Sequence, residues 1–169
     1  MSATTHSTAR HKLHVTMPTD TEVRMERMFD APRQLVWDAF TKAEMLEKWW
    51  GLRSTTTKVE KLEVRVGGKY RFLQTDPTGT VHAFRGEFTA VSPIDALGYT
   101  FEYEPMAGHI VQDDVTFEDH GRQTKIVAVM TFTSKMDRDG MVNSGMEYGA
   151  AESYDMLDEL LAELGASVI

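Results

Sequence analysis

The sequence contains no cysteine, which excludes disulfide bonds, thiol nucleophiles and thiolate metal ligands. It has no apolar run near the roughly 18 residues that span a bilayer, and residues 1–15 lack the apolar core of a secretory signal. Basic residues are the minority, with 18 Lys and Arg against 26 Asp and Glu and a net charge of −8. Such a charge repels nucleic-acid phosphates and anionic lipids. We therefore expect a cytoplasmic protein with no nucleic-acid or membrane partner.

The composition is typical of one globular domain. The 169 residues are 41% hydrophobic and 26% charged, and this length suffices to enclose a core. Residues 1–20 are polar and show no periodicity, so we expect a flexible tail there and a single domain over residues 21–169. The histidines of this tail have no further ligand at helical spacing, and we interpret them as solvated. We predict no metal site and no cofactor.

The clearest helical pattern covers residues 143–165. Ser144 and Glu147 match a capping box at its start, and Gly165 is typical of a helix end. One face of this helix carries small residues around Gly149 in its first half and leucines in its second half. The leucines can fill a core. The small residues leave room, either for a closely packed backbone or for a ligand.

The rest of the chain shows mainly strand patterns. Residues 23–29 alternate apolar and charged side chains, as a half-buried strand does, and residues 30–32 then begin the first of two short helices. Trp49 and Trp50 end the second, and we expect one ring to pack inward and the other to lie nearer a pocket mouth. Six strand patterns joined by short turns occupy residues 55–132, which predicts an antiparallel meander.

Together these elements predict an α+β fold. A seven-stranded antiparallel sheet and the long C-terminal helix carry the only large apolar faces, so they must bury each other. The two short helices after the first strand would close one end of the curved sheet. A hollow is then expected between the sheet and the small-residue half of the helix.

Six motifs follow one another along the chain: Phe29-Asp30-Ala31-Pro32, Leu35-Val36-Trp37-Asp38-Ala39-Phe40, Trp49-Trp50-Gly51, Glu63-Val64-Arg65-Val66-Gly67-Gly68, Phe84-Arg85-Gly86-Glu87 and Met146-Glu147-Tyr148-Gly149. In this order they resemble the family homologous to the C-terminal domain of the activator of Hsp90 ATPase. That family belongs to the START-like superfamily, which has the helix-grip fold of the birch pollen allergen. The resemblance covers residues 21–165 and implies a deep cavity, which the superfamily uses for sterols, lipids and polyketides.

The chain departs from the family pattern in two places. Hsp90 activators carry a separate N-terminal domain that binds the chaperone, whereas only residues 1–20 precede the fold here, so we do not expect Hsp90 as a partner. Val66 stands where many relatives have proline, which changes only the local turn.

We interpret the protein as a non-enzymatic binder of a hydrophobic or amphipathic small molecule, such as a lipid or polyketide. The predicted cavity wall consists of Trp37, Phe40, Trp49, Phe84, Phe101, Thr131, Met146, Gly149 and Ser153. The predicted polar anchor is Arg71 or Glu87. Strand alternation leaves open whether Arg71 or its neighbours Tyr70 and Phe72 face inward.

Other functions stay open. A cyclase- or hydrolase-type enzyme could use the same cavity with His82 or His109 as general base, although no nucleophile elbow, HExxH motif or dinucleotide fingerprint occurs. A metal site of His109, Asp113 and His120 would require two loops to converge. A chaperone cofactor or stress-response protein is a third reading, and a homodimer formed through an exposed strand is compatible with each.

Overall fold

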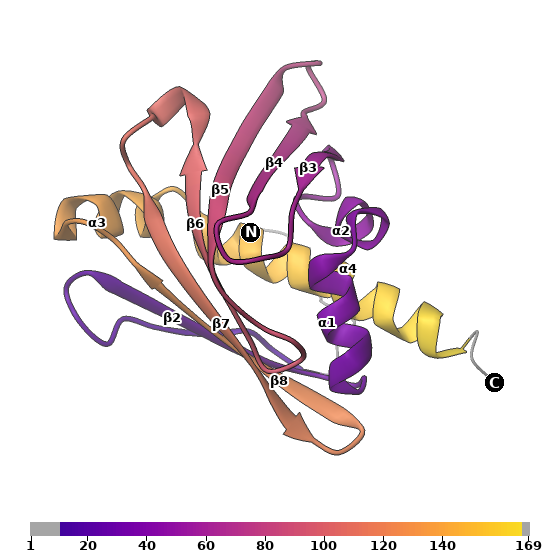
Figure 1. The fold of residues 1–169 in the computed structure, drawn as a ribbon. Helices are drawn as coiled ribbons and strands as arrows, with labels where there is room; N and C mark the ends of the chain where they lie inside the picture. Colours follow the sequence, from indigo (N-terminus) through magenta and orange to yellow (C-terminus); the bar gives the residue numbers. More distant parts are fainter. Residues whose placement is uncertain (1–10, 167–169) are drawn as a thin grey trace, which may run out of the picture.

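The computed structural model describes residues 11–166, in which one curved antiparallel sheet holds a long helix (Figure 1). In chain order the elements are β1 His14–Thr16, β2 Glu22–Phe29, α1 Arg33–Thr41, α2 Ala43–Trp49, β3 Thr56–Leu62, β4 Lys69–Thr75, β5 Val81–Ser92, β6 Ala96–Tyr103, the single 3-10 turn η1 Glu104–Met106, β7 Val111–His120, β8 Gln123–Thr131, α3 Lys135–Asn143 and α4 Met146–Ala166. The order of strands and helices matches the α+β helix-grip prediction.

Within residues 11–166 eight strands form the sheet, in the order β1-β2-β8-β7-β6-β5-β4-β3. The strands β3 to β8 are the predicted meander, and β2 pairs with the last of them. The eighth strand, β1, was not predicted. It lies in the expected tail, where Val15 pairs with Met25 of β2. Residues 1–10 of that tail lie outside the described residues.

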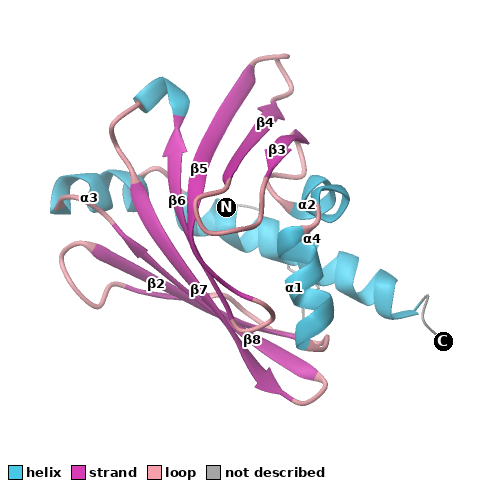
Figure 2. Cartoon of the chain, in the orientation of Figure 1, coloured by secondary structure: helices cyan, strands magenta, loops and turns pink. Residues whose placement is uncertain are grey.

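The sheet curves around α4, while α1 and α2 lie together at one end of the sheet (Figure 2). The second half of α4 forms the core with the sheet, because Leu157, Leu160 and Leu161 are all buried. The ring of Tyr154 meets Phe29 of β2 edge to face, with centroids 5.6 Å apart. Each fully buried leucine contributes roughly 2 kcal/mol, so this half fixes the helix to the sheet.

The start of the long helix differs from the prediction. Ser144 does not cap it, because its hydroxyl donates a hydrogen bond of 2.6 Å back to the carbonyl of Met141 and ends α3. Gly145 follows with φ +87°, a backbone conformation that favours glycine, and α4 begins at Met146. The preceding helix α3 was missed, although its cap is local: the Asp137 amide donates to the Ser134 hydroxyl at 3.0 Å.

None of the helices within residues 11–166 combines the length and the apolar character that crossing a membrane requires.

Candidate functional site

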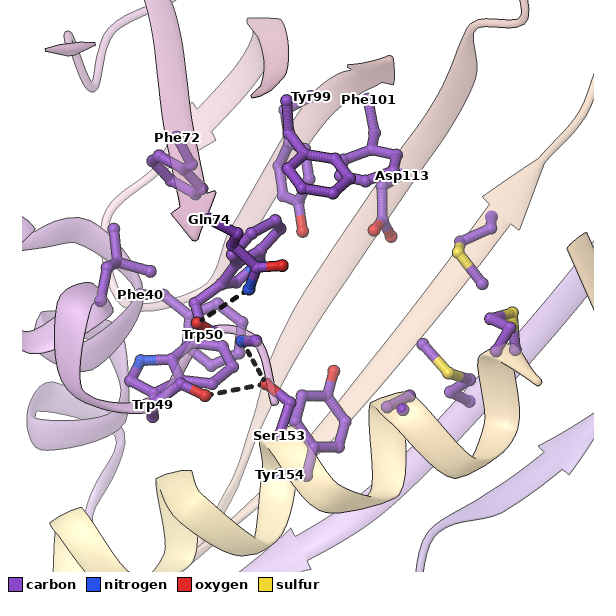
Figure 3. A pocket seen from close by; sticks show the side chains of 18 of the residues that line it. Phe40, Trp49, Trp50, Phe72, Gln74, Tyr99, Phe101, Asp113, Ser153 and Tyr154 are labelled. Carbon is purple, nitrogen blue, oxygen red and sulfur yellow. Dashed lines mark hydrogen bonds between the residues drawn. The ribbon is translucent and has the colours of Figure 1, made fainter. Parts of the chain in front are cut away.

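A cavity of about 510 Å³ lies between the sheet and the first half of α4 (Figure 3). Aromatic side chains of α1, α2 and the strands β4, β5 and β6 form one wall, and methionines and small residues of the α3–α4 region form the other. Protein interiors otherwise contain few voids larger than a water molecule. A space of this volume falls in the range of small-molecule sites, roughly 300–1,000 Å³.

Most of the predicted wall residues lie around this cavity. The structure places seven of them in its lining: Phe40, Trp49, Phe84, Phe101, Met146, Gly149 and Ser153. They come from five different helices and strands, and the largest separation, between Phe40 and Ser153, exceeds a hundred residues. The fold therefore brings the predicted wall together, while its role in binding stays a prediction.

Two predicted wall residues lie elsewhere. Trp37 is 8% exposed and packs edge-on against Phe117, with ring centroids 5.4 Å apart, so it belongs to the core beside α1 rather than to the cavity. Thr131 is exposed at the end of β8, whereas the preceding residue, Met130, lines the cavity. Successive strand side chains point to opposite faces, so the prediction at Thr131 was wrong by one residue.

The predicted anchors also face away from the cavity. On β4 the side chains of Tyr70, Phe72 and Gln74 line the cavity, so alternation turns Arg71 to the outer face. There its guanidinium donates to Glu104 at 2.7 Å. On β5 the side chains of Phe84 and Phe88 line the cavity, so alternation turns Glu87 to the outer face as well. The structure therefore places both predicted anchors outside the cavity, because neighbouring positions on the same strands face it.

The adjacent tryptophans point in different directions, as predicted. Trp49 is buried, and its indole N–H donates to the Ala39 carbonyl at 2.8 Å. Trp50 forms part of the aromatic cavity wall, with ring centroids 5.0 Å from Phe72 and 5.2 Å from Phe84. Edge-to-face contacts of this kind are favourable beyond the area they bury. They fix the orientation of the Trp50 ring in the cavity wall.

The end of α2 and the loop after it, which carry these tryptophans, are fixed to α4 by Ser153. Its hydroxyl donates to the Trp49 carbonyl at 2.9 Å and accepts from the Gly51 amide at 3.2 Å. Gly51 has φ +116°, and a Cβ there would lie 1.8 Å from Nε2 of Gln74. Because Gln74 could move its side-chain end aside, it is this positive φ that requires glycine. Ser153 thus positions the cavity wall and has its hydrogen bonds satisfied within the protein.

Asp113 on β7 is the one carboxylate among the described cavity-lining residues, and it was not among the predicted anchors. Its Oδ1 is buried and has no hydrogen-bond partner within the described residues. Burial raises the pKa of Asp113 to about 7, against an opposing hydrogen bond from Tyr99, and the Asp114 charge adds to the rise. A sequence signal existed: Val111, Asp113 and Val115 alternate on one strand face, which puts a carboxylate in an apolar row.

Two tyrosines share the cavity with Asp113. Tyr99 is its direct partner across β6 and β7, and Tyr154 of α4 reaches toward it from the other side of the cavity (Figure 3). Burial, and after it the negative charge of Asp113, raises the pKa of both tyrosines well above 10. Their hydroxyls are therefore neutral near pH 7 and are able to donate hydrogen bonds.

None of the histidines in residues 11–166 lines the cavity. His82 contacts Tyr103 at 2.7 Å and Asp76 at 2.8 Å on another part of β5, and His109 contacts Asp137 at 3.0 Å in an exposed position. The structure therefore does not support histidine as the cavity base. The described part of the chain also holds no group of three His, Asp or Glu residues arranged for a metal ion.

Comparison with known proteins identifies the family. Residues 30–162 of the 169 match the family described as activator of Hsp90 ATPase homolog 1-like protein, and the chain belongs to this family. No curated protein matches the chain significantly.

Solved structures confirm the fold. The chain is similar to an Arthrobacter aurescens protein solved by NMR, with 27% identity, 89% of this chain and 91% of the other covered, and a TM-score of 0.81. A Mycobacterium smegmatis protein has 26% identity over 88% and 95% of the two chains and a TM-score of 0.78. A Rhodobacter sphaeroides protein shares the fold at 22% identity over 90% and 99%, with a TM-score of 0.83.

Proposed function

We propose that this protein binds a hydrophobic or amphipathic small molecule in the cavity beside α4. The observation that supports this most is the volume of about 510 Å³ enclosed by mainly aromatic and aliphatic side chains. Transfer of an apolar molecule from water onto such walls is favourable by roughly 25 cal/mol per Å² buried. The use of this cavity for apolar ligands across the superfamily agrees with the proposal.

The site is largely formed before a ligand arrives. Trp50 is held by its ring contacts with Phe72 and Phe84 and by the hydrogen bond of 2.5 Å that its carbonyl accepts from Thr57. Ser153 fixes the neighbouring carbonyl of Trp49. Side chains that are already ordered lose little entropy when a ligand binds. This favours specific uptake of a molecule that fits the wall.

Substitutions at Gly149 test the proposal. A Cβ at this position meets only Cδ2 of Leu52, at 3.7 Å, so Gly149→Ala should fold and bind like the unmodified protein. Gly149→Leu adds a side chain that occupies cavity volume. We expect it to weaken binding of the uncharged fluorophore N-phenyl-1-naphthylamine by roughly tenfold or more. Equal affinity in the leucine variant, with the fold retained by circular dichroism, would overturn the proposal.

One observation favours a second candidate function, an enzyme that moves a proton on its bound substrate. Asp113 has a pKa of about 7, and a general acid or base works best when its pKa is near the operating pH. Mass spectrometry of the molecule retained by Asp113→Asn and by the unmodified protein separates the two candidates. Binding alone predicts that the molecule retained by the variant has the same identity as that in the unmodified protein, whatever its amount, whereas an enzyme predicts that the variant accumulates unconverted substrate.

The proposal places the protein in the cytoplasm and includes no chaperone partner. A pull-down with Hsp90 tests the second point, and the protein should remain in the flow-through. Gel filtration tests whether two copies associate through an exposed strand.

A further inference from the structure

In its described part, the cavity contains an acidic side chain but no basic one. Its lining, among the described residues, contains one carboxylate, Asp113, and no lysine, arginine or histidine. Asp113 lies on β7 and is half-buried as a whole, but its Oδ1 is buried and has no hydrogen-bond partner in the described protein. A buried carboxylate oxygen without a donor is costly. A ligand that brings a donor to this oxygen would remove that cost.

Resting on the binding function above, we propose that the ligand is a hydrophobic amine, whose apolar body lies on the aromatic wall and whose ammonium group donates to Asp113. A fatty acid is disfavoured at this site. Its carboxylate would find no counter-ion among the described lining residues and would face the charge of Asp113 at low dielectric, where like charges repel strongly.

The surroundings of Asp113 suit a cation better than a neutral hydroxyl. Tyr99 stands directly opposite Asp113, and the next inward residue of β6 is Phe101, whose ring stacks on Phe84 at 5.5 Å. Both Phe101 and Phe84 line the cavity. Aromatic faces attract ammonium groups, the more so where water is excluded. An ammonium group that binds Asp113 therefore enters a cavity whose wall is largely aromatic.

Within residues 11–166 no lysine, arginine or histidine lines the cavity with Asp113. The buried guanidinium of Arg27, which acts electrostatically on Tyr154, does not line the cavity and is paired with Asp155 at 2.8 Å. The groups that act electrostatically on or with Asp113 are Tyr70, Tyr99, Tyr154 and Asp114. The tyrosines stay neutral, because burial raises the pKa of each, and Asp114 is negative. An entering ammonium is thus the positive charge that this site lacks.

Three compounds with the same alkyl chain test the proposal: dodecylamine, dodecanol and dodecanoic acid. Each is titrated at micromolar concentration and about pH 8 against bound N-phenyl-1-naphthylamine, whose fluorescence reports displacement. We expect the amine to bind roughly tenfold or more tighter than the acid, with the alcohol between them. An acid that binds as tightly as the amine would overturn the proposal.

Two matched variants complete the test. Asp113→Asn keeps the shape of the side chain and should reduce amine affinity by roughly tenfold while the alcohol changes by less than about threefold. Asp114→Asn removes the same charge from an exposed neighbour and should leave the order of the three compounds unchanged. Binding of the uncharged fluorophore to each variant shows that its cavity is intact.

The two levels of the proposal fail differently. If the fluorophore and all three compounds fail to bind the unmodified protein, the binding function itself is wrong. If the fluorophore binds and the amine shows no advantage, or Asp113→Asn leaves that advantage in place, only the ligand class is wrong.

Discussion

The two halves of α4 face the same sheet but carry side chains of different size. The second half buries Leu157, Leu160 and Leu161 in the core. The first half presents Gly149 and Ala150, together with Ser153, to a cavity. One helix therefore has two tasks: large apolar residues provide stability at one end, and small residues leave space at the other. The comparison teaches that side-chain volume along a single helix can separate stability from binding.

The two halves should differ most in how much stability is lost when a large side chain is truncated to alanine. Leu157 is 0% exposed, so Leu157→Ala should lower the free energy of unfolding by roughly 3 kcal/mol through lost burial and a new cavity. Met146 already borders empty space, and Met146→Ala should cost less than about 1 kcal/mol. Urea denaturation measures both. Equal losses would remove the distinction between the halves.

The sheet residue opposite the first half should make stability depend on pH. The pKa of Asp113 is about 7 in the folded protein and about 3.9 in an unfolded chain. As pH rises between these values, the unfolded state ionises first, so stability falls from about pH 4 to about pH 7. Asp113→Asn should remove this loss and be more stable at about pH 8 by roughly 2 kcal/mol. Parallel stability curves for the two proteins would contradict the account.

Loss of the Ser153 hydroxyl should have a smaller effect. Ser153→Ala removes the hydrogen bonds to Trp49 and Gly51 and should destabilise the protein by roughly 1 kcal/mol. It should also weaken fluorophore binding, because the Trp50 wall loses its attachment to α4. The control is Ser144→Ala, which removes an exposed hydroxyl bonded only to Met141. If the control is as destabilising as Ser153→Ala, Ser153 has no special role.

The smallest expected change in stability is a gain rather than a loss. Gly149→Ala should raise stability by up to about 1 kcal/mol, because alanine favours helix and its Cβ meets only Leu52 at 3.7 Å. Gly140→Ala in α3, where a Cβ meets nothing within 4 Å, should give a similar gain. Thermal denaturation compares them. A loss of stability at Gly149 alone would mean that the glycine serves close packing rather than open volume.

Local patterns predicted much of the architecture. Alternating residues gave the strands, short turns gave the antiparallel order, and the leucine face gave α4, since each of these depends on neighbours in sequence. The boundary at Ser144 was misjudged because a capping pattern fits the end of α3 as well as the start of a helix. The strand β1 is three residues long, too short for a periodic signal.

The candidate site was only partly predictable. The glycine and serine of α4 and the aromatic wall followed from residue type, but the anchors depended on which strand face turns inward. On β4 the face that carries Arg71 also carries the apolar Leu73. Both faces of this strand therefore hold apolar residues, and alternation did not decide which one turns inward. At Asp113 alternation was clear, because Val111 and Val115 flank it. The cavity itself depends on sheet curvature and on contacts between residues far apart in the chain.

Methionine methyl NMR tests most directly whether a small molecule enters the cavity beside the first half of α4. Four methionines line the cavity, and three exposed ones lie outside it. With methyl-labelled protein and N-phenyl-1-naphthylamine, the account predicts that ring-current shifts occur at Met25, Met130, Met141 and Met146 and that the signals of Met17, Met106 and Met136 do not move. Shifts confined to the exposed methionines, or no shifts at saturating fluorophore, would contradict it.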